Sequence, residues 1–275
     1  MEDFRKYVLD LRVNDVRRLH ERYVLLRLTQ DGPLPPMMPG QFVEVRVDGS
    51  SSTFLRRPIS ICYVDRDQNE LWLLVAVVGD GTRWLSTLGS GDVVNVVGPL
   101  GHGFSLPAGE PAGTEARREA SAGVRNEVLL VGGGVGVAPL LYQGAFLRSL
   151  GAEPTFLLGA RRAEDLLLLD EFGRHGEVLV TTEDGSAGER GFVTQHSVLG
   201  KRRFDLIQSC GPTPMMKAVA RYAYQTDTDC EVSLENMMAC GLGACLCCVE
   251  KTTEGNLCVC KEGPVFNIKK LLWQL

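Results

Sequence analysis

Six of the nine cysteines in this 275-residue chain fall between residues 240 and 260. Four of them follow the spacing C-x4-C-x2-C-x11-C, namely Cys240, Cys245, Cys248 and Cys260. A C-x4-C-x2-C run with a distant fourth cysteine is the plant-type arrangement for a [2Fe–2S] cluster. The spacing therefore predicts that four thiolates near the carboxyl end hold two irons.

The residues between these cysteines support the same interpretation. Gly241 and Gly243 fall in the first interval, where converging thiolates force the backbone into left-handed conformations that favour glycine. Four cysteines could also bind a structural zinc ion, but zinc sites usually pair two short C-x2-C units, whereas three ligands here come from one nine-residue loop. Cys247 and Cys258 compete as ligands, and Cys258 in place of Cys260 is the main alternative.

A second candidate site is the glycine-rich turn Gly132-Gly133-Gly134-Val135-Gly136. It follows an apolar strand-like segment and precedes a helical spacing of apolar residues, and in that order backbone N–H groups and a helix N-terminus can hold a pyrophosphate. Cys210-Gly211-Pro212 also lies between a predicted strand and a predicted helix, where parallel sheets bind ligands. An ordinary turn with a buried cysteine is the alternative.

The specificity for NAD or NADP stays open at this level. The acidic residue that often follows the second strand of a dinucleotide fold is missing, and Gly159-Ala160-Arg161-Arg162 stands there instead. These arginines could meet a 2′-phosphate, or they could face solvent, as arginines usually do.

The elements that must position these sites fall into two groups. The first hundred residues hold short apolar or alternating segments separated by Gly and Pro turns, which predicts a small antiparallel barrel from strands at 23–28, 41–47, 71–78 and 92–97. From residue 127 strands alternate with helices, which predicts a parallel sheet. The expected strands are 127–131, 155–158, 177–180 and 204–208, and the expected helices are 138–150, 166–172 and 215–224.

Three units follow from this pattern. We predict an FAD-binding β-barrel domain over residues 1–106, a nucleotide-binding α/β domain over 127–230 and a small [2Fe–2S] subdomain over 231–275. Residues 107–126 are rich in Ala, Gly, Glu and Arg without apolar periodicity, which is typical of a linker or loop insertion. A helical excursion within one domain is the alternative.

Composition excludes several classes of function. The formal net charge is −5 and no stretch clusters Lys and Arg, which argues against nucleic-acid binding. Residues 1–6 lack the basic start and apolar run of a secretory signal, and no apolar stretch is long enough to span a bilayer. We expect a cytoplasmic protein without membrane contact, where crowded cysteines indicate metal or redox chemistry rather than disulfides.

These motifs together resemble the ferredoxin reductase-like family, and more narrowly the electron-transfer subunits of NAD-dependent (class 1B) dihydroorotate dehydrogenases. The resemblance extends over nearly the whole chain. The R-P-x-S and C-G-P-x-x-M motifs are family-wide, while the S-L-E-N-M-M-A-C-G-L-G-A-C stretch and the later C-K-E-G-P-V-F narrow it. Its segments are 56–61, 79–82 with 98–101, 131–141, 210–215, 233–245 and 260–266.

The resemblance implies an FAD site on the barrel. Arg57 would contact the pyrophosphate, as suits a planar guanidinium donor, and Ser60 would lie near the flavin ring. The other implied FAD contacts are Pro58, Ile59, Leu74, Val75, Ala76, Gly81 and Thr82. Relatives commonly have Tyr-Arg where this chain has Val75-Ala76, so an aromatic stack and a cation near FAD are missing.

The resemblance also implies a nicotinamide nucleotide site. Cys210 would lie near the nicotinamide ring in a positioning role. Glu235, just before the cysteine loop, would tune proton movement at the flavin, although a solvated carboxylate is the alternative. The remaining implied contacts are Gly132, Gly133, Gly134, Gly136, Gly211 and Pro212.

The implied function is that of an oxidoreductase subunit in which FAD, a [2Fe–2S] cluster and NAD(H) carry the chemistry. A hydride carries two electrons and the cluster accepts one, so a flavin must lie between nicotinamide and cluster. The implied partner is an FMN-containing catalytic subunit that oxidises dihydroorotate in pyrimidine (UMP) biosynthesis, in a heterotetramer of two of each.

Three alternatives remain on the sequence alone. Subunits of ferredoxin-NADP+ reductases or transhydrogenases, and the diaphorase component of a sulfhydrogenase, share the same motifs. A zinc-bound regulatory module without flavin is the non-enzymatic alternative.

Overall fold

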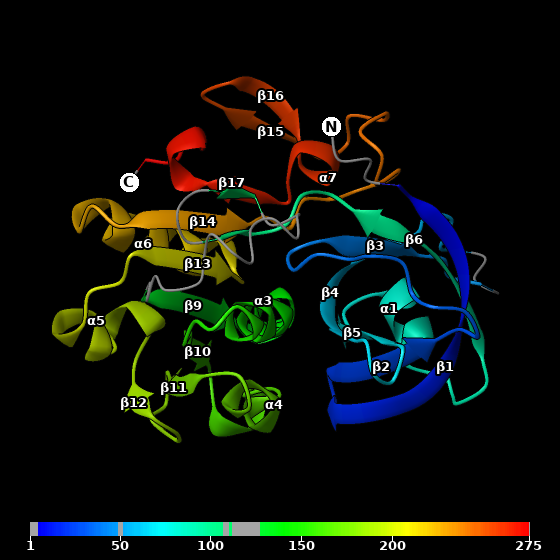
Figure 1. Ribbon diagram of the computed structural model, residues 1–275, viewed down its shortest axis with the longest axis horizontal. Helices are drawn as coiled ribbons and strands as arrows, with labels where there is room; N and C mark the ends of the chain where they lie inside the picture. Colours follow the sequence, from blue (N-terminus) through cyan, green and yellow to red (C-terminus); the bar gives the residue numbers. More distant parts are fainter. Residues whose placement is uncertain (1–4, 49–51, 107–109, 112–126, 275) are drawn as a thin grey trace.

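The computed structural model describes residues 5–48, 52–106, 110–111 and 127–274. A closed β-barrel and a helix-flanked sheet lie side by side, and the cysteine-bearing segment runs along one side of both (Figure 1). The segment 107–126, predicted as a linker or loop insertion, lies outside the described residues except for 110–111, which form the short strand β8.

The barrel confirms the predicted antiparallel architecture. Its strands close in the order β1-β2-β5-β4-β3-β6. The bounds are β1 Tyr7–His20, β2 Tyr23–Thr29, β3 Phe42–Val45, β4 Arg57–Asp65, β5 Glu70–Ala76 and β6 Val93–Leu100, and the helix α1 (Asp80–Leu85) follows β5. Alternate apolar residues of these strands fill the interior, since successive strand residues point to opposite faces.

The second body is a seven-stranded sheet in the order β12-β11-β10-β9-β13-β14-β17, parallel except for β17. The prediction of a parallel sheet is therefore confirmed. The strand bounds are β9 Val128–Gly133, β10 Thr155–Ala160, β11 Glu177–Thr182, β12 Glu189–Arg190, β13 Leu206–Cys210, β14 Asp229–Ser233 and β17 Val265–Asn267. The helices of this body are α3 Ala138–Ser149, α4 Leu169–Gly173, α5 Val198–Lys201 and α6 Thr213–Gln225.

The strand order creates a topological switch between β9 and β13. From β9 the chain proceeds outward through β10, β11 and β12, and then returns to place β13 on the other side of β9. In open α/β sheets, ligands bind at the carboxyl ends of the strands at such a switch. The glycine-rich turn follows β9, and Cys210-Gly211-Pro212 ends β13, so both predicted nucleotide-binding segments lie at this point.

The cysteine segment is attached to the sheet at both of its ends. β14 leads into it, and β17 returns antiparallel to β14. Between them lie the hairpin β15 (Val249–Thr252) and β16 (Gly255–Cys258) and the short helix α7 (Val259–Glu262). Because β14 spans 229–233, the predicted domain boundary after residue 230 falls inside this strand.

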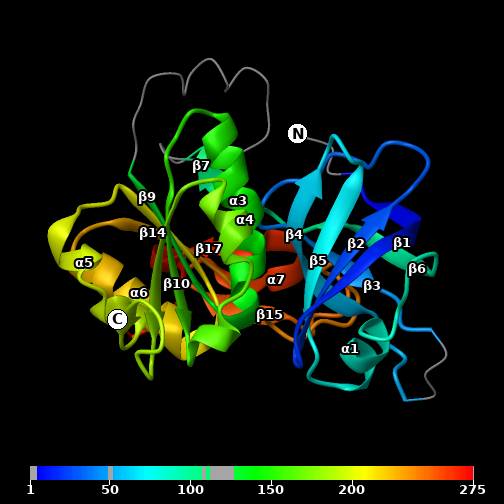
Figure 2. The ribbon, with the colours of Figure 1, turned by 90° about the horizontal axis from the view of Figure 1, so that it is seen from below.

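Helix α3 packs against β4 and joins the two bodies, as the view from below shows (Figure 2). The Tyr142 hydroxyl on α3 donates a 2.9 Å hydrogen bond to the Met37 carbonyl of the barrel side. Tyr63 of β4 contacts the rings of Tyr142 and His175 across the same seam. The barrel and the sheet are thus held together by packing as well as by polar contacts.

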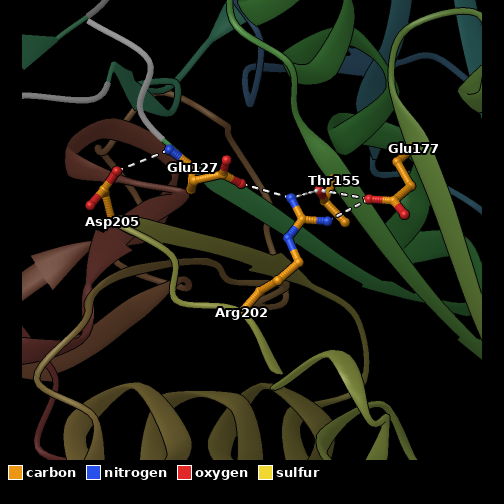
Figure 3. Close-up of polar contacts among 5 residues, drawn as sticks. All are labelled: Glu127, Thr155, Glu177, Arg202 and Asp205. Carbon is orange, nitrogen blue, oxygen red and sulfur yellow. Dashed lines mark hydrogen bonds and ion pairs between the residues drawn. The ribbon is translucent and has the colours of Figure 1, made fainter. Parts of the chain in front are cut away.

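A polar cluster ties the amino ends of the parallel strands together, at the edge opposite the switch (Figure 3). The Arg202 guanidinium donates to Glu127 before β9 at 2.7 Å, to Glu177 of β11 at 2.5 Å and to Thr155 of β10 at 3.1 Å. Asp205 accepts a 2.9 Å hydrogen bond from the Glu127 backbone. One side chain therefore links three adjacent strand beginnings.

Candidate functional site

The glycine-rich turn and the Cys210 turn pack backbone against backbone. Gly132 and Cys210 are partners in the β9–β13 ladder. A Cβ placed on Gly136 would lie 2.4 Å from the Cα of Gly211, and one on Gly133 would lie 2.7 Å from the Sδ of Met215. A side chain on Gly136 would push the two turns apart, and one on Gly133 would displace the Met215 side chain. The glycines therefore keep a bare backbone at the switch point, as close approach to a pyrophosphate requires.

Cys210 and Glu235 come together at the carboxyl ends of β13 and β14. Cys210 is fully buried and pairs with Ser233, whose side chain hydrogen-bonds to it. Burial raises the pKa of the Cys210 thiol well above its usual value, and the Glu235 charge adds to the effect. The thiol therefore stays neutral, which suits a positioning role rather than nucleophilic attack.

Glu235 has a solvent-exposed surface, but burial around its carboxyl group raises its pKa above the usual glutamate value. Glu235 lies just beyond the carboxyl end of β14. Its carboxyl group holds a proton more tightly than a glutamate in water does, so it can hold or move a proton at this position. The family resemblance implies that Cys210 lies near the nicotinamide ring and that Glu235 tunes proton movement at the flavin, and the structure brings the two residues within electrostatic reach of each other.

Arg57 and the first turn of α1 converge on the barrel. A Cβ on Gly81 would lie only 2.6 Å from the Nε of Arg57, so a side chain at this position would displace the guanidinium. Thr82 accepts hydrogen bonds from the Val78 and Gly79 N–H groups at 2.9 and 3.0 Å, which orders the turn. A guanidinium beside first-turn N–H groups, which lack partners within the helix, is a donor set that fits a pyrophosphate.

The residues of β4 alternate between the two faces of the barrel wall. Ile59 packs on the interior cluster. Pro58 pairs with Glu44 and Ser60 pairs with Phe42 across the β3–β4 ladder, and since Val43 and Val45 fill the interior, these pairs face outward. Pro58 and Ser60 thus present an outer face on which a flat ring could lie.

On β5 the predicted flavin contacts are split. Val75 is fully buried in the barrel interior, so only its backbone could reach a ligand outside. Leu74 packs on the outer side with residues of α3, and Ala76 is half-buried opposite Tyr23. Tyr23 therefore places an aromatic ring beside Ala76.

The cysteine loop directs backbone N–H groups at its sulfurs. Leu242 N–H points at the Cys240 sulfur at 3.3 Å, Gly243 N–H at the Cys260 sulfur at 3.1 Å, and the Cys260 N–H at the Cys248 sulfur at 3.3 Å. Gly241 and Gly243 adopt φ of +67° and +80°, the left-handed conformations expected from the sequence. N–H donors aimed at sulfur favour thiolates and suit an iron–sulfur core.

The four predicted ligands approach one another in pairs. The Cys245 thiol hydrogen-bonds to Cys240, and the Cys260 thiol hydrogen-bonds to Cys248. Burial alone would raise the pKa of Cys240, but the surrounding N–H groups and the Cys245 thiol lower it to about 6. Burial and the neighbouring Cys248 raise the pKa of Cys260 to about 12.

The competing cysteines have different surroundings. The buried Cys258 points its thiol at the Gly243 carbonyl at 3.9 Å, whereas the Gly243 N–H meets Cys260, and Cys247 is exposed. Within the described ranges, no three Cys, His, Asp or Glu side chains converge closely enough for one metal ion.

A residue that sequence reasoning missed lies between the barrel and the cysteine loop. Glu44 is 1% exposed, and neither of its carboxyl oxygens has a hydrogen-bond partner among the described residues. Burial raises its pKa to about 7, against the opposing influence of Arg56 and Arg57. An acidic residue within the apolar run FVEV is typical of an outward, solvent-exposed strand position, so its burial could not be predicted from the local pattern.

Arg161 and Arg162, which could meet the 2′-phosphate of NADP, are exposed where β10 ends. Arg162 forms a 3.5 Å ion pair with Glu164. Both side chains are therefore reachable from the carboxyl edge of the sheet. No helix in the described part of the chain combines the length and apolar character needed to cross a membrane.

Comparison with known proteins gives consistent relatives. Residues 235–272 match the family model of the iron–sulfur cluster binding domain of dihydroorotate dehydrogenase B. The chain is 40% identical over 249 residues to the dihydroorotate dehydrogenase B (NAD(+)) electron transfer subunit of Lysinibacillus sphaericus (strain C3-41), covering 88% of this chain and 90% of that one. The subunit of the same name from Caldanaerobacter subterraneus subsp. tengcongensis is 35% identical over 275 residues, covering 98% of this chain and 100% of that one.

Solved structures agree with this fold. The structure of an NADH-dependent reduced ferredoxin-NADP oxidoreductase matches with a TM-score of 0.79 at 30% identity, over 96% of this chain and 90% of that one. The ferredoxin reductase in carbazole 1,9a-dioxygenase matches with a TM-score of 0.63 at 19% identity, over 83% of this chain and 68% of that one. At this identity the similarity shows a shared fold only.

Proposed function

Because this chain belongs to the family of dihydroorotate dehydrogenase B (NAD(+)) electron transfer subunits, we propose that it transfers electrons from an FMN-containing catalytic subunit to NAD+ in pyrimidine (UMP) biosynthesis. FAD, a [2Fe–2S] cluster and NAD(H) supply the redox chemistry, and the polypeptide sets their distances and orientations. The observation that carries the proposal is the packing of the cysteine loop on the outer face of β3, next to the strand that bears Pro58 and Ser60.

The barrel residues would hold FAD. Arg57, Gly81 and Thr82 form the donor set for the pyrophosphate, and the outer face of β4 supports the ring. Leu74, Val75 and Ala76 border the same region of β5, Val75 through its backbone. We propose that residues 1–106 form the FAD-binding domain, residues 127–230 the NAD-binding domain and residues 231–275 the cluster-binding subdomain. Strand β14 contributes residues to the last two.

The switch point between β9 and β13 would hold the nicotinamide nucleotide. The bare backbone of the two turns accommodates the pyrophosphate, while the neutral Cys210 thiol orients the ring and Glu235 holds a proton at the adjoining edge. The names of the relatives favour NAD. The contacts we propose are Gly132, Gly133, Gly134, Gly136, Gly211 and Pro212.

Cys240, Cys245, Cys248 and Cys260 would hold the cluster, one pair to each iron, because a two-iron core takes two thiolates per iron. The pairs Cys240–Cys245 and Cys248–Cys260 support this assignment. The N–H groups of the loop would stabilise the negative charge of the sulfurs.

The catalytic partner would dock over the cysteine loop. Met237, Leu242 and Leu246 around this loop are 84%, 47% and 64% exposed, and such apolar side chains are typical of the central part of an interface. We infer a heterotetramer of two of each subunit in the cytoplasm, where the nine thiols, which form no disulfide, stay reduced.

Coexpression with a candidate catalytic chain tests this function. The copurified complex should reduce NAD+ when dihydroorotate is supplied, and the isolated subunit should contain FAD, iron and acid-labile sulfide. A subunit that contains neither iron nor sulfide after anaerobic preparation would contradict the proposal.

The 30% identity to the NADH-dependent reduced ferredoxin-NADP oxidoreductase structure favours a second candidate, a subunit of such an oxidoreductase. The exposed Arg161 and Arg162 would then accept a 2′-phosphate. Reduced-ferredoxin-dependent reduction of NADP+, without activity on dihydroorotate, would decide for this candidate.

A further inference from the structure

Glu44 is a buried acid to which the proposed function assigns no role. It is 1% exposed, and its carboxyl oxygens meet no donor among the described residues. A buried polar group without a hydrogen-bond partner destabilises the fold, and a charged group destabilises it more. A hydrogen-bond partner from outside the polypeptide would remove this destabilisation.

On the barrel side, Glu44 belongs to the face that would carry FAD. Val43 and Val45 point into the barrel, so Glu44 and Phe42 point out of it. Glu44 is the ladder partner of Pro58, and directly opposed residues share a face. The carboxyl group therefore lies on the outer wall of β3 and β4.

On the other side, the cysteine loop lies directly on Glu44. A Cβ on Gly241 would lie 2.8 Å from the Cγ and 3.1 Å from the Oε1 of Glu44. Gly241 follows Cys240 in the chain. The side chain is thus enclosed between the barrel wall and the loop that would wrap the cluster.

Among the described residues, no cation pairs with this carboxyl group. The Arg56 guanidinium instead donates to the backbone carbonyl of Glu44 at 3.3 Å and to the side chain of Asn95 at 2.5 Å. None of the described ion pairs includes Glu44, and thiolates of the cluster would add negative charge nearby. Desolvation and the negative charge of Cys240 favour the neutral acid, and together they outweigh the opposing charges of Arg56 and Arg57. The neutral acid carries one O–H donor, and the cluster sulfurs are acceptors.

We propose that Glu44 is a positioning residue whose carboxylic acid donates a hydrogen bond to a sulfur of the [2Fe–2S] cluster and raises the cluster's reduction potential. The inference rests on the proposed function, since it requires the cluster. Hydrogen bonds to the sulfurs are among the features that set the potential of such clusters, because the donor dipole stabilises the additional negative charge of the reduced state.

Two variants of similar size separate hydrogen bonding from packing. Glu44→Gln keeps an N–H donor and Glu44→Met has none, and both remove the ionisable group. The measurement is a redox titration of the purified holoprotein, followed by electron paramagnetic resonance. E44M should lower the equilibrium constant for reduction of the cluster about tenfold, which corresponds to a reduction potential lower by about 59 mV for one electron. E44Q should stay within about threefold of the native protein.

The flavin serves as the internal reference. Its midpoint, followed by visible absorbance in the same samples, should not move in either variant. Equal cluster midpoints in E44M and E44Q, or a shift confined to the flavin, would overturn the proposal. Glu70→Gln is the matched control, because Glu70 is a buried barrel carboxylate already bonded to Asn14 and Trp72.

An infrared measurement on the native protein applies even if E44M fails to assemble. The reduced-minus-oxidised spectrum should contain a protonated carboxyl C=O band that is lost in E44Q and kept in E70Q. A native spectrum without that band would refute the inference. Iron, sulfide and the cluster signal of the native protein are measured first, so a missing cluster would reject the proposed function, whereas a cluster indifferent to Glu44 would reject this inference alone.

Discussion

Gly136 and Gly211 face each other so closely that a Cβ on the former would lie 2.4 Å from the Cα of the latter. The contact joins two turns that are about seventy-five residues apart in the sequence. It fixes the width of the crevice in which a dinucleotide would bind, because both turns approach through backbone atoms.

Gly136→Ala should therefore push the two turns apart. We expect the KM for NADH to rise at least tenfold and the free energy of unfolding to fall by about 1–3 kcal/mol, the usual cost of overpacking. Steady-state diaphorase kinetics and urea denaturation measure both effects. Gly200→Ala is the control, because nothing lies within 4 Å of its Cβ position, and an unchanged KM in G136A would contradict the assignment of this crevice.

The fourth cluster ligand can be identified with a matched pair of alanine variants. Cys260→Ala should lose iron, sulfide and the cluster absorbance, because this sulfur accepts from the Gly243 N–H and its thiol hydrogen-bonds to Cys248. Cys258→Ala should keep them, since its thiol contacts a carbonyl instead. Iron and sulfide analysis after anaerobic purification distinguishes the two, and the reverse pattern would make Cys258 the ligand.

Removing the guanidinium of Arg57 should weaken flavin binding. A charge-assisted hydrogen bond to phosphate contributes about 1.5–3 kcal/mol, so Arg57→Ala should raise the Kd for FAD by about 10- to 100-fold. Flavin content after gel filtration and fluorescence titration of the apoprotein measure this. Arg12→Ala, an exposed arginine of the barrel paired with Asp31, should retain FAD, and equal retention in R57A would remove Arg57 from the site.

Arg202→Met should destabilise the sheet without changing cofactor content. The arginine links the beginnings of three strands through Glu127, Thr155 and Glu177. Its side chain is 36% exposed, so solvent screens part of the interaction and we expect a loss of about 1–2 kcal/mol. Urea denaturation at low and high salt measures this loss. A difference that does not shrink with salt would mean that packing, rather than charge, is responsible.

Glu44 should give the cluster-free protein a particular pH dependence. Its pKa is about 7 in the folded chain, raised from 4.5 by burial, so the folded state binds the proton more tightly than the unfolded state. Stability should therefore fall as the pH rises from about 4.5 through about 7, and E44Q should lack this fall. Above this window E44Q should be more stable than the native apoprotein by about 3 kcal/mol. Denaturant titrations below and above the window measure the difference, and parallel pH profiles would contradict it.

Local patterns predicted most of the architecture. The predicted strand at 23–28 and the predicted helix at 138–150 match β2 and α3 closely, because their apolar residues repeat with the period of the element. β1 was not predicted, since its exposed positions carry charged residues such as Arg17 and Arg18 that mask the alternation. The helix expected over 166–172 starts only at Leu169, because Leu168 adopts φ +58° and interrupts it.

The candidate site was predictable only where it is local. The cysteine spacing and the glycine turn could be recognised because each lies within one short segment. The contact between Gly136 and Gly211 depends on the order of strands in the sheet, and the burial of Glu44 depends on a loop nearly two hundred residues later. Neighbourhoods formed by distant segments leave no periodic trace in the sequence.

The return of β17 to β14 anchors the cysteine loop at both of its ends. β14, which leads into the loop, pairs with β13, and β17, which leaves it, pairs with β14. The two ends of the loop are therefore attached to the same sheet whose neighbouring strands, β9 and β13, carry the glycine-rich turn and the Cys210 turn, so a displacement of this sheet would move the cysteines together with both turns.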